Sequence, residues 1–292
     1  MANTRRSEGW VALLLVGPFV CVYGWMFIYP SLQMAWLSFT DAPLIGAGEW
    51  NDFKNYDRLT GDRTFGTAIW NTLYFVLLTV IPGTLTALGI ALMVSRLKGW
   101  LQSGILAAFF LPYILPVSVV YRIWQWVFDL QFGIAQYVLE PIVGEPVAVW
   151  RRYEWFMPAV GLVTIWWTCG FSILLFLAGL RNIPKELYEA ASLDGADRWV
   201  NFRRITWPLI WPVTALVMTI QLILQLKIFD QVYLFAQGGR TNTTMVLVQY
   251  IYEQAFVHNR GGYAATVALA LFVLIVVVSV LQYQSLRARG GR

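Results

Sequence analysis

The chain has 292 residues, of which 58% are hydrophobic and only 13% are charged, with a mean hydropathy of +0.59 and a net charge of +5. A soluble domain carries roughly 25% charged residues. This composition therefore excludes an ordinary soluble domain, and the long apolar runs have to face lipid or each other. The single histidine, His258, forms no cluster, and Cys21 and Cys169 both lie in apolar segments, so neither a metal site nor a disulfide framework is indicated.

Six apolar segments are long enough to span a membrane, since a spanning helix needs about 20 residues at about 1.5 Å rise each. In chain order they run near Trp10–Leu32, Ala68–Val94, Gly104–Phe128, Phe156–Leu180, Ile205–Phe235 and Tyr263–Leu286. The first apolar stretch follows a polar, basic start and continues well beyond a signal-peptide core, so we expect it to be retained as a helix. The sequence predicts an all-α integral membrane protein with about six transmembrane helices.

Prolines lie inside several of these segments: Pro82, Pro112, Pro116, Pro208 and Pro212. Proline removes a backbone N–H and kinks a helix, and in a membrane the freed carbonyls need other partners. Such kinks are compatible with helices arranged around a pathway and equally with irregular packing.

Basic residues are distributed unevenly over the loops. With both termini on one side, that side holds the larger set, which is Arg5, Arg6, Arg96, Lys98, Arg181, Lys185, Arg198, Arg203, Arg204, Arg287, Arg289 and Arg292. The opposite side holds a smaller set, diluted by acidic residues, which is Lys54, Arg58, Arg63, Arg151, Arg152, Arg240 and Arg260. Because cytoplasmic loops carry an excess of Lys and Arg, both termini are predicted to be cytoplasmic.

The loop of about residues 182–207, between the fourth and fifth segments, has helical character and is then cytoplasmic too. Pro184 stands early, acidic residues occupy the first turn, and Gly195 breaks the run. Residues 197–204 form a predicted second short amphipathic helix, and Pro208 marks the return into the membrane. Exposed small and apolar residues on this loop suit either a protein partner or the lipid headgroup region.

The residues of this loop also match a known pattern. They are Glu189, Ala190, Ala191, Gly195, Ile205 and Pro208. Their order and spacing resemble the EAA motif of permease subunits of binding-protein-dependent ABC importers. The family pattern has leucine before the final proline, where this chain has Trp207, an apolar residue in place of another.

A second stretch is similar to the carbohydrate permeases of the maltose and glycerol-phosphate type within that family. It comprises residues 227–233, Gly238, Gly239, Thr243, Thr244, residues 250–252, Ala255 and Phe256. That group usually has proline after the glycine pair, where this chain has Arg240, so the turn there differs locally. The resemblance extends from the first predicted helix to the sixth.

This resemblance implies a single transmembrane permease domain over residues 1–292, with the type I ABC importer fold. The loop would be a coupling helix seated in a groove of a cytoplasmic ATPase. By position, Glu189 would pair with a basic residue of the ATPase, Ala190 and Ala191 would allow close contact, and Gly195 would supply the turn. The remaining residues assigned to this contact are Asp194, Ile205 and Pro208.

The resemblance also implies the partners. They are a second permease subunit that is a paralogue of this one, two copies of the ATPase, a periplasmic or lipid-anchored solute-binding protein and a carbohydrate substrate. The assembly would lie in the bacterial inner membrane, without nucleic acid. The chain has no phosphate-binding loop of the G-x-x-x-x-G-K-[ST] type. We therefore expect no enzymatic activity and no cofactor in this chain, with ATP and Mg²⁺ bound by the partner ATPase.

Two basic residues at membrane depth are candidates for the substrate pathway, because charge there is costly and marks a pathway or an ion pair. Lys227 lies three residues before Asp230, so the two can pair on one helix face. That spacing is also a feature of the family, which favours a structural ion pair over substrate contact. Arg122 either contacts the substrate or snorkels to the outer interface. Together the cations raise the hypothesis of an anionic glycoside or phosphorylated polyol.

Neutral polar side chains suit a polyhydroxylated substrate that has to bind and leave. Gln221 and Gln225 lie one turn apart in the fifth segment, and Tyr233 follows two turns later. Interhelical hydrogen bonding by the glutamines is the alternative. The remaining candidates for this pathway are Trp166, Trp167 and Asn71. The tryptophans either stack on a sugar face or serve packing and interfacial placement.

An ion-coupled secondary transporter is the main alternative function. Such carriers usually show internal repeats and intramembrane acids. Here Asp230 is the main acid near membrane depth and no repeat is evident. A membrane-embedded enzyme is disfavoured by the scarcity of catalytic side chains.

Overall fold

The computed structural model describes residues 14–236 and 243–290, the last five of these as backbone only. Trp10, where the first predicted helix begins, lies outside the described residues, as do Gly238, Gly239 and Arg240 of the second motif. Within the described ranges there is no strand, only one isolated antiparallel bridge between Thr40 and Trp50. The all-α prediction is confirmed.

Five helical segments are long and apolar enough to cross a membrane: Leu14–Leu37, Arg63–Val94, Tyr153–Arg181, Arg198–Leu226 and Gly261–Ser285. A sixth crossing is formed if α5 (Gly99–Ile114) and α6 (Val117–Val127), which meet at 104°, count as one span. These segments coincide with the six predicted ones in order and approximate position.

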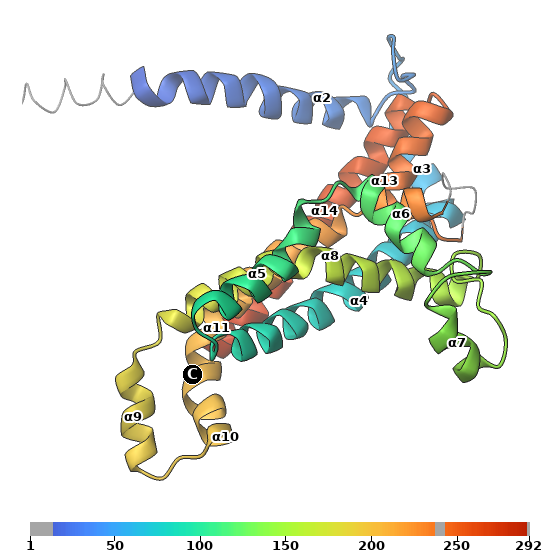
Figure 1. Cartoon of the computed structure of the whole chain (residues 1–292). Helices are drawn as coiled ribbons and strands as arrows, with labels where there is room; N and C mark the ends of the chain where they lie inside the picture. The colour runs from blue at the N-terminus through green and yellow to red at the C-terminus, as the bar shows by residue number, and fades with distance from the viewer. Residues whose placement is uncertain (1–13, 237–242, 291–292) are drawn as a thin grey trace, which may run out of the picture. The chain divides into compact units, whose positions relative to one another are not determined.

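The chain divides into two compact units, residues 1–62 with 250–272 and residues 63–249 with 273–292. Figure 1 labels helices of both units, coloured by their place in the chain. The first unit contains η1 (Gly24–Ile28), α2 (Tyr29–Leu37), α3 (Lys54–Gly61) and η3 (Glu253–Val257). The second contains α4 (Arg63–Val94), α5, α6, α7 (Gln136–Val143), α8 (Tyr153–Arg181), α9 (Lys185–Leu193), α10 (Arg198–Asn201), η2 (Phe202–Thr206), α11 (Trp207–Leu226) and α12 (Asp230–Phe235). Helices α13 (Leu247–Tyr252) and α14 (Gly261–Gly290) contribute to both.

A carboxylate holds the first unit together. Asp62, directly after α3, accepts hydrogen bonds from the hydroxyls of Tyr250 and Tyr263, the latter at 2.6 Å. The guanidinium of Arg58 stacks 4.1 Å from the centre of the Tyr263 ring. Burial, and then the hydrogen bond to Asp62, raises the pKa of Tyr250 to about 12. The neutral phenol is therefore the form that the folded unit requires.

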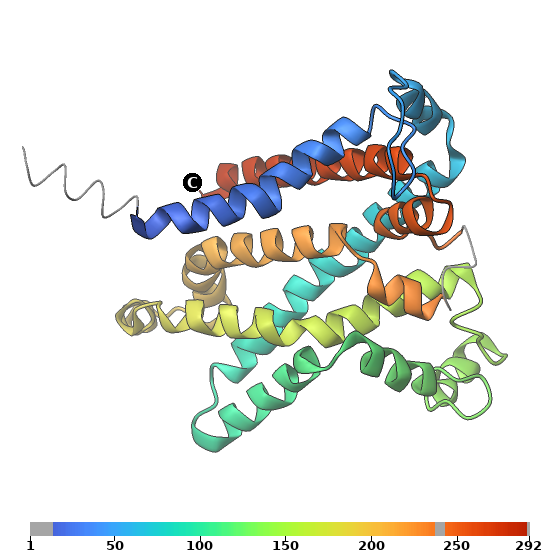
Figure 2. The same ribbon diagram turned by 90° about the horizontal axis from the view of Figure 1, so that it is seen from above.

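The core of the second unit lies where α4, α8 and α11 pack together, with α4 crossing α8 and α5 running beside it (Figure 2). Two glycines of α8 set these distances. A Cβ atom at Gly170 would lie 2.3 Å from the carbonyl oxygen of Phe109 in α5, and one at Gly179 would lie 2.7 Å from Val213 in α11. Small residues at such contacts let membrane helices approach closely.

The third predicted helix is not continuous. Leu115 and Pro116 adopt extended backbone conformations between α5 and α6. Proline disfavours a helical conformation in the residue before it, which explains why the bend falls at Leu115. The indole N–H of Trp167 in α8 donates to the Leu115 carbonyl at 3.2 Å, so the carbonyl exposed by the break is satisfied within the protein.

The fifth predicted helix has different ends from those expected. The short helix predicted over residues 197–204 does not stop before Pro208, because α10 passes through the π-helical turn η2 into α11 and makes one helical run, Arg198–Leu226. Pro208 lies inside this run, two residues after the end of the π-helical turn η2, where the regular backbone hydrogen-bond pattern already changes. The run then ends at Leu226 and not near Phe235.

Candidate functional site

Helix α9 forms the first arm of the loop between α8 and α11, and the loop stands away from the ends of those two helices (Figure 1). Pro184 is the N-cap, with an extended backbone, and Glu186 lies in the first turn. The arm ends at Gly195, whose φ of +78° is a left-handed conformation that glycine adopts at little cost. The N–H of Gly195 donates to Ser192 and that of Ala196 to Ala191, which closes the helix end.

The residues that resemble the EAA motif lie mainly on the outside of this arm. Glu189, Ala190 and Asp194 are exposed, and Ala191 is half-buried. Next to them, the side chain of Leu193 is 89% exposed. Of the motif's later members, Pro208 is exposed and Ile205 is half-buried. An acidic and apolar surface of small residues is thus presented at the tip of the loop.

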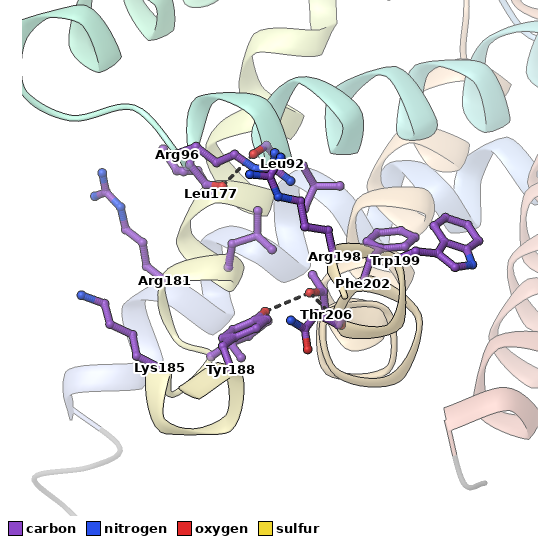
Figure 3. A pocket seen from close by; sticks show the side chains of 14 residues that line it. Leu92, Arg96, Leu177, Arg181, Lys185, Tyr188, Arg198, Trp199, Phe202 and Thr206 are labelled. Carbon is purple, nitrogen blue, oxygen red and sulfur yellow. Dashed lines mark hydrogen bonds between the residues drawn. The ribbon is translucent and has the colours of Figure 1, made fainter. Parts of the chain in front are cut away.

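The second arm is tied to the first. Asp197 caps α10 by accepting a hydrogen bond from the Val200 N–H at 2.7 Å. Across the loop, the hydroxyls of Tyr188 in α9 and Thr206 in η2 lie 2.9 Å apart and share a hydrogen bond (Figure 3). Because η2 continues into α11, α9 is connected to the fifth span by this bond as well as by the chain.

Behind the loop lies a cavity of about 810 Å³ that the sequence reasoning missed. Its lining includes four basic residues: Arg96, Arg181, Lys185 and Arg198 (Figure 3). They come from the segment after α4, the end of α8, the start of α9 and the start of α10. The sequence singled them out only as part of the charge asymmetry, because nothing in their spacing shows that the fold brings them to one cavity.

The glutamines predicted for the pathway form a hydrogen-bonded chain between helices. The side-chain amide of Gln225 donates to Gln221 at 3.1 Å, and the amide of Gln221 donates to the Ser172 hydroxyl in α8 at 3.0 Å. Both glutamines are buried. This is the arrangement expected of interhelical hydrogen bonding, the alternative that the sequence left open.

The predicted ion pair between Lys227 and Asp230 is wrong for this structure. Lys227 is the C-cap of α11, and Asp230 is the first residue of α12. The i, i+3 rule applies within one helix, whereas Phe229 takes a non-helical conformation between these two. The same break removes Tyr233 from the face of Gln221 and Gln225; Tyr233 instead stacks on Phe229 at 5.1 Å.

The remaining cation and the two tryptophans lie around α6. Arg122 is exposed, donates to Gln125 at 3.1 Å and lies 5.4 Å from the ring centre of Tyr121. Trp166 meets Trp124 edge to face at 5.4 Å. Trp167 makes the bond to the α5 end described above, so both tryptophans pack against the core that surrounds α12.

Asn71 is fully buried in α4 and holds the segment before α13. Its side-chain N–H groups donate to the carbonyls of Thr243 and Met245 at 2.7 and 2.8 Å. Its side-chain oxygen accepts from the Tyr153 hydroxyl at 3.1 Å. Both donors and the acceptor of this amide are thus engaged within the protein.

Comparison with known proteins identifies the family. A model described as "Binding-protein-dependent transport system inner membrane component" matches residues 83–289. The arabinooligosaccharides transport system permease protein AraP of Bacillus subtilis is 32% identical over 99% of this chain and 94% of its own length. The sulfoquinovosyl glycerol transport system permease protein SmoG of Agrobacterium fabrum is 30% identical over 96% of this chain and 91% of its own length.

The fold is shared with a solved transporter. A chain of a bacterial ABC transporter involved in the import of the acidic polysaccharide alginate superposes with a TM-score of 0.86, at 24% identity and over 98% of both chains. The family match decides between the two classes of transporter, in favour of the importer and against the ion-coupled carrier. The chain belongs to the family of inner membrane components of binding-protein-dependent transport systems, the non-catalytic permease subunits of ATP-driven importers.

Proposed function

We propose that the α9–α10 loop, residues 182–207, is the place where a cytoplasmic ATPase subunit docks and drives the membrane helices of this permease. The observation that carries the proposal is the surface at the tip of α9. Glu189, Ala190 and Leu193 are exposed there on an arm held away from the bundle. Small residues permit close approach by a partner, and an exposed carboxylate offers it a charged hydrogen-bond acceptor.

The connection from this surface into the membrane supports a mechanical role. Motion of α9 reaches the fifth span by way of the Tyr188–Thr206 hydrogen bond and the continuous run from Arg198 to Leu226. A chain of packed and hydrogen-bonded rigid elements is what can transmit a displacement between distant sites. ATP and Mg²⁺ are bound by the partner, and this chain contributes no cofactor ligand.

The transported solute is a carbohydrate or a related glycoside or polyol. Support comes from the relatives, whose transport systems are named for arabinooligosaccharides and sulfoquinovosyl glycerol. The solute is delivered by a binding protein, and a second permease subunit of related sequence forms the other half of the pathway, together with two ATPase copies. Both termini face the cytoplasm, as the distribution of basic residues favours.

Uncoupling variants test this function. Gly195→Asp makes the left-handed φ of +78° costlier and adds a charged side chain at the turn, and Ala190→Trp blocks the docking surface. Both variants should insert normally while uptake of the solute held by the cognate binding protein falls at least about tenfold. The ATPase activity that the binding protein stimulates should fall with it. Ser192→Trp is the matched control, because Ser192 is exposed two residues along α9 and points to the other side of the helix.

Two results would separate the alternatives. Wild-type uptake by both variants, at normal membrane abundance, would show that the loop does not couple the ATPase to transport. Equal loss in Ser192→Trp would show that bulk anywhere on the loop is harmful, and the specific docking face would have to be given up.

A further inference from the structure

We infer that the cavity behind the α9–α10 loop is a binding site for an anionic phospholipid, with its phosphate among the basic residues and an acyl chain along a groove on α4. The four basic residues Arg96, Arg181, Lys185 and Arg198 line a cavity of about 810 Å³. No acidic side chain of the described residues contributes to its lining.

The charge in this cavity is not balanced by the protein. Among the residues that the structure describes, none of these four basic residues forms an ion pair. Arg181 donates instead to the neutral amide of Gln102 at 3.0 Å. Like charges around one cavity repel each other, and a bound anion offsets that repulsion through its attraction to each cation.

Two arginines of the lining are the groups that we expect to hold the anion. Figure 3 shows Arg96 and Arg198 among the side chains that line the cavity, one from the segment after α4 and the other from the start of α10. Guanidinium groups present several N–H donors in a planar fork and suit the oxygens of a phosphate.

An apolar groove continues from the cavity, which distinguishes a lipid from a soluble anion. This groove has a volume of about 510 Å³ and shares Leu92, Trp199 and Phe202 with the lining of the basic cavity. Its wall on α4 is formed by residues spaced three and four apart, which therefore lie on one face of the helix: Leu85, Leu88, Gly89 and Leu92.

The direction of the groove fits a membrane lipid. Leu92 lies at the end of the α4 span and Leu85 lies two turns, or about 10 Å, further into it. The basic cavity thus stands at the depth of the headgroups and the groove runs toward the hydrocarbon. A basic pocket between helix ends is the setting in which anionic headgroups bind.

The test is the binding of phosphatidylglycerol to the delipidated, purified full-length chain, measured by native mass spectrometry. Phosphatidylglycerol should bind, phosphatidylcholine should bind far more weakly, and inorganic phosphate should not displace the lipid. R96Q/R198Q should weaken binding about thirtyfold, since each arginine near an anionic headgroup contributes about 1 kcal/mol. Arg204→Gln is the charge-matched control, because Arg204 is exposed in η2 and lines neither space.

A second pair of variants tests the groove. A Cβ at Gly89 meets nothing within 4 Å, so the side chain of Gly89→Leu begins in open space at the groove and should weaken phosphatidylglycerol binding. Gly66→Leu, in the same helix and with the same open space at its Cβ, should not. Equal binding of phosphatidylcholine, or displacement of the lipid by inorganic phosphate, would overturn the proposal. So would unchanged binding in both R96Q/R198Q and Gly89→Leu. The lipid comparisons use the wild-type chain and stand even where a variant folds poorly.

Discussion

Asn71 shows how a polar side chain that the sequence suggests for substrate binding can have all its hydrogen bonds satisfied within the folded protein. A lone amide in an apolar helix is chemically suited to a sugar, and the sequence alone offers no way to see its partners. In the structure these are two carbonyls almost 175 residues away and a hydroxyl on α8. Backbone carbonyls of an irregular segment inside a membrane protein need such donors, because water is absent.

Replacing Asn71 should therefore act on stability. Asn71→Ala leaves the Thr243 and Met245 carbonyls without donors and should cost on the order of 3 kcal/mol. Tyr153→Phe removes one bond from the same amide and should cost about 1 kcal/mol. Thermal unfolding in detergent checks both, and solute uptake per folded molecule should stay near wild type. If Asn71→Ala unfolds at the wild-type temperature but loses uptake, Asn71 acts in the substrate pathway and not in stability.

Tyr250 contributes a dependence on alkaline pH to the stability of the first unit. Its pKa is raised from 10.0 to about 12, first by burial and then by its hydrogen bond to Asp62. A raised pKa in the folded state means that the stabilisation is fully present below pH 10 and is lost as the pH rises through about 12.

The unfolding temperature should therefore fall more steeply between pH 10 and about 12 in the wild type than in Tyr250→Phe. The variant should be the less stable of the two at neutral pH, because it lacks the hydroxyl that donates to Asp62. Parallel curves for the two proteins over this range would show that another group controls the alkaline loss.

At the level of helices, the sequence was most informative where hydrophobicity alone decides the outcome. The spans α4 and α8 were predicted within a few residues, because their ends follow the loss of apolar character. The ends of α11 were not, since η2 joins it to α10 without a loop and Lys227 caps it within a still apolar stretch. The pairing of Lys227 with Asp230 failed for that reason.

The contacts between helices could not be predicted from the sequence, because the residues that meet are far apart in the chain. Nothing around Trp167 shows that its indole meets the carbonyl of Leu115, and nothing around Arg96 and Arg198 shows that they share a cavity. The loop motif was readable because its residues lie close together in the chain. The geometry of the pathway and of the basic cavity depends on elements that meet only after folding.

Close packing of α8 against α5 depends on Gly170. A methyl group there would lie 2.3 Å from a backbone oxygen of α5, which has little freedom to move. Gly170→Ala should therefore cost about 1–3 kcal/mol through overpacking and lower the unfolding temperature. Gly66→Ala in α4 is the control, because a Cβ there meets nothing within 4 Å. Equal stability of the two variants would mean that α5 shifts to accommodate the methyl group.

For the molecule as a whole, the bend between α5 and α6 leaves open whether this pair of helices crosses the membrane or re-enters it. Between Ile45 and Leu193 lie the spans α4 and α8 and the bent pair. If the bent pair crosses the membrane, three crossings separate the two residues and they lie on opposite sides. If it re-enters, only two crossings separate them and they lie on the same side.

Single cysteines at these two positions distinguish the cases, because both side chains are almost fully exposed, at 88% and 89%. The background chain has Cys21 and Cys169 replaced by serine. A membrane-impermeant thiol reagent, added to cells with a permeabilised outer membrane, should label Ile45→Cys and leave Leu193→Cys unlabelled. That result makes the bent pair a crossing and places the α9–α10 loop in the cytoplasm. Labelling of both or of neither would make it a re-entrant pair. The reverse pattern would keep the crossing but invert the orientation, and the basic residues of the loop would then face away from the ATPase that the proposal requires.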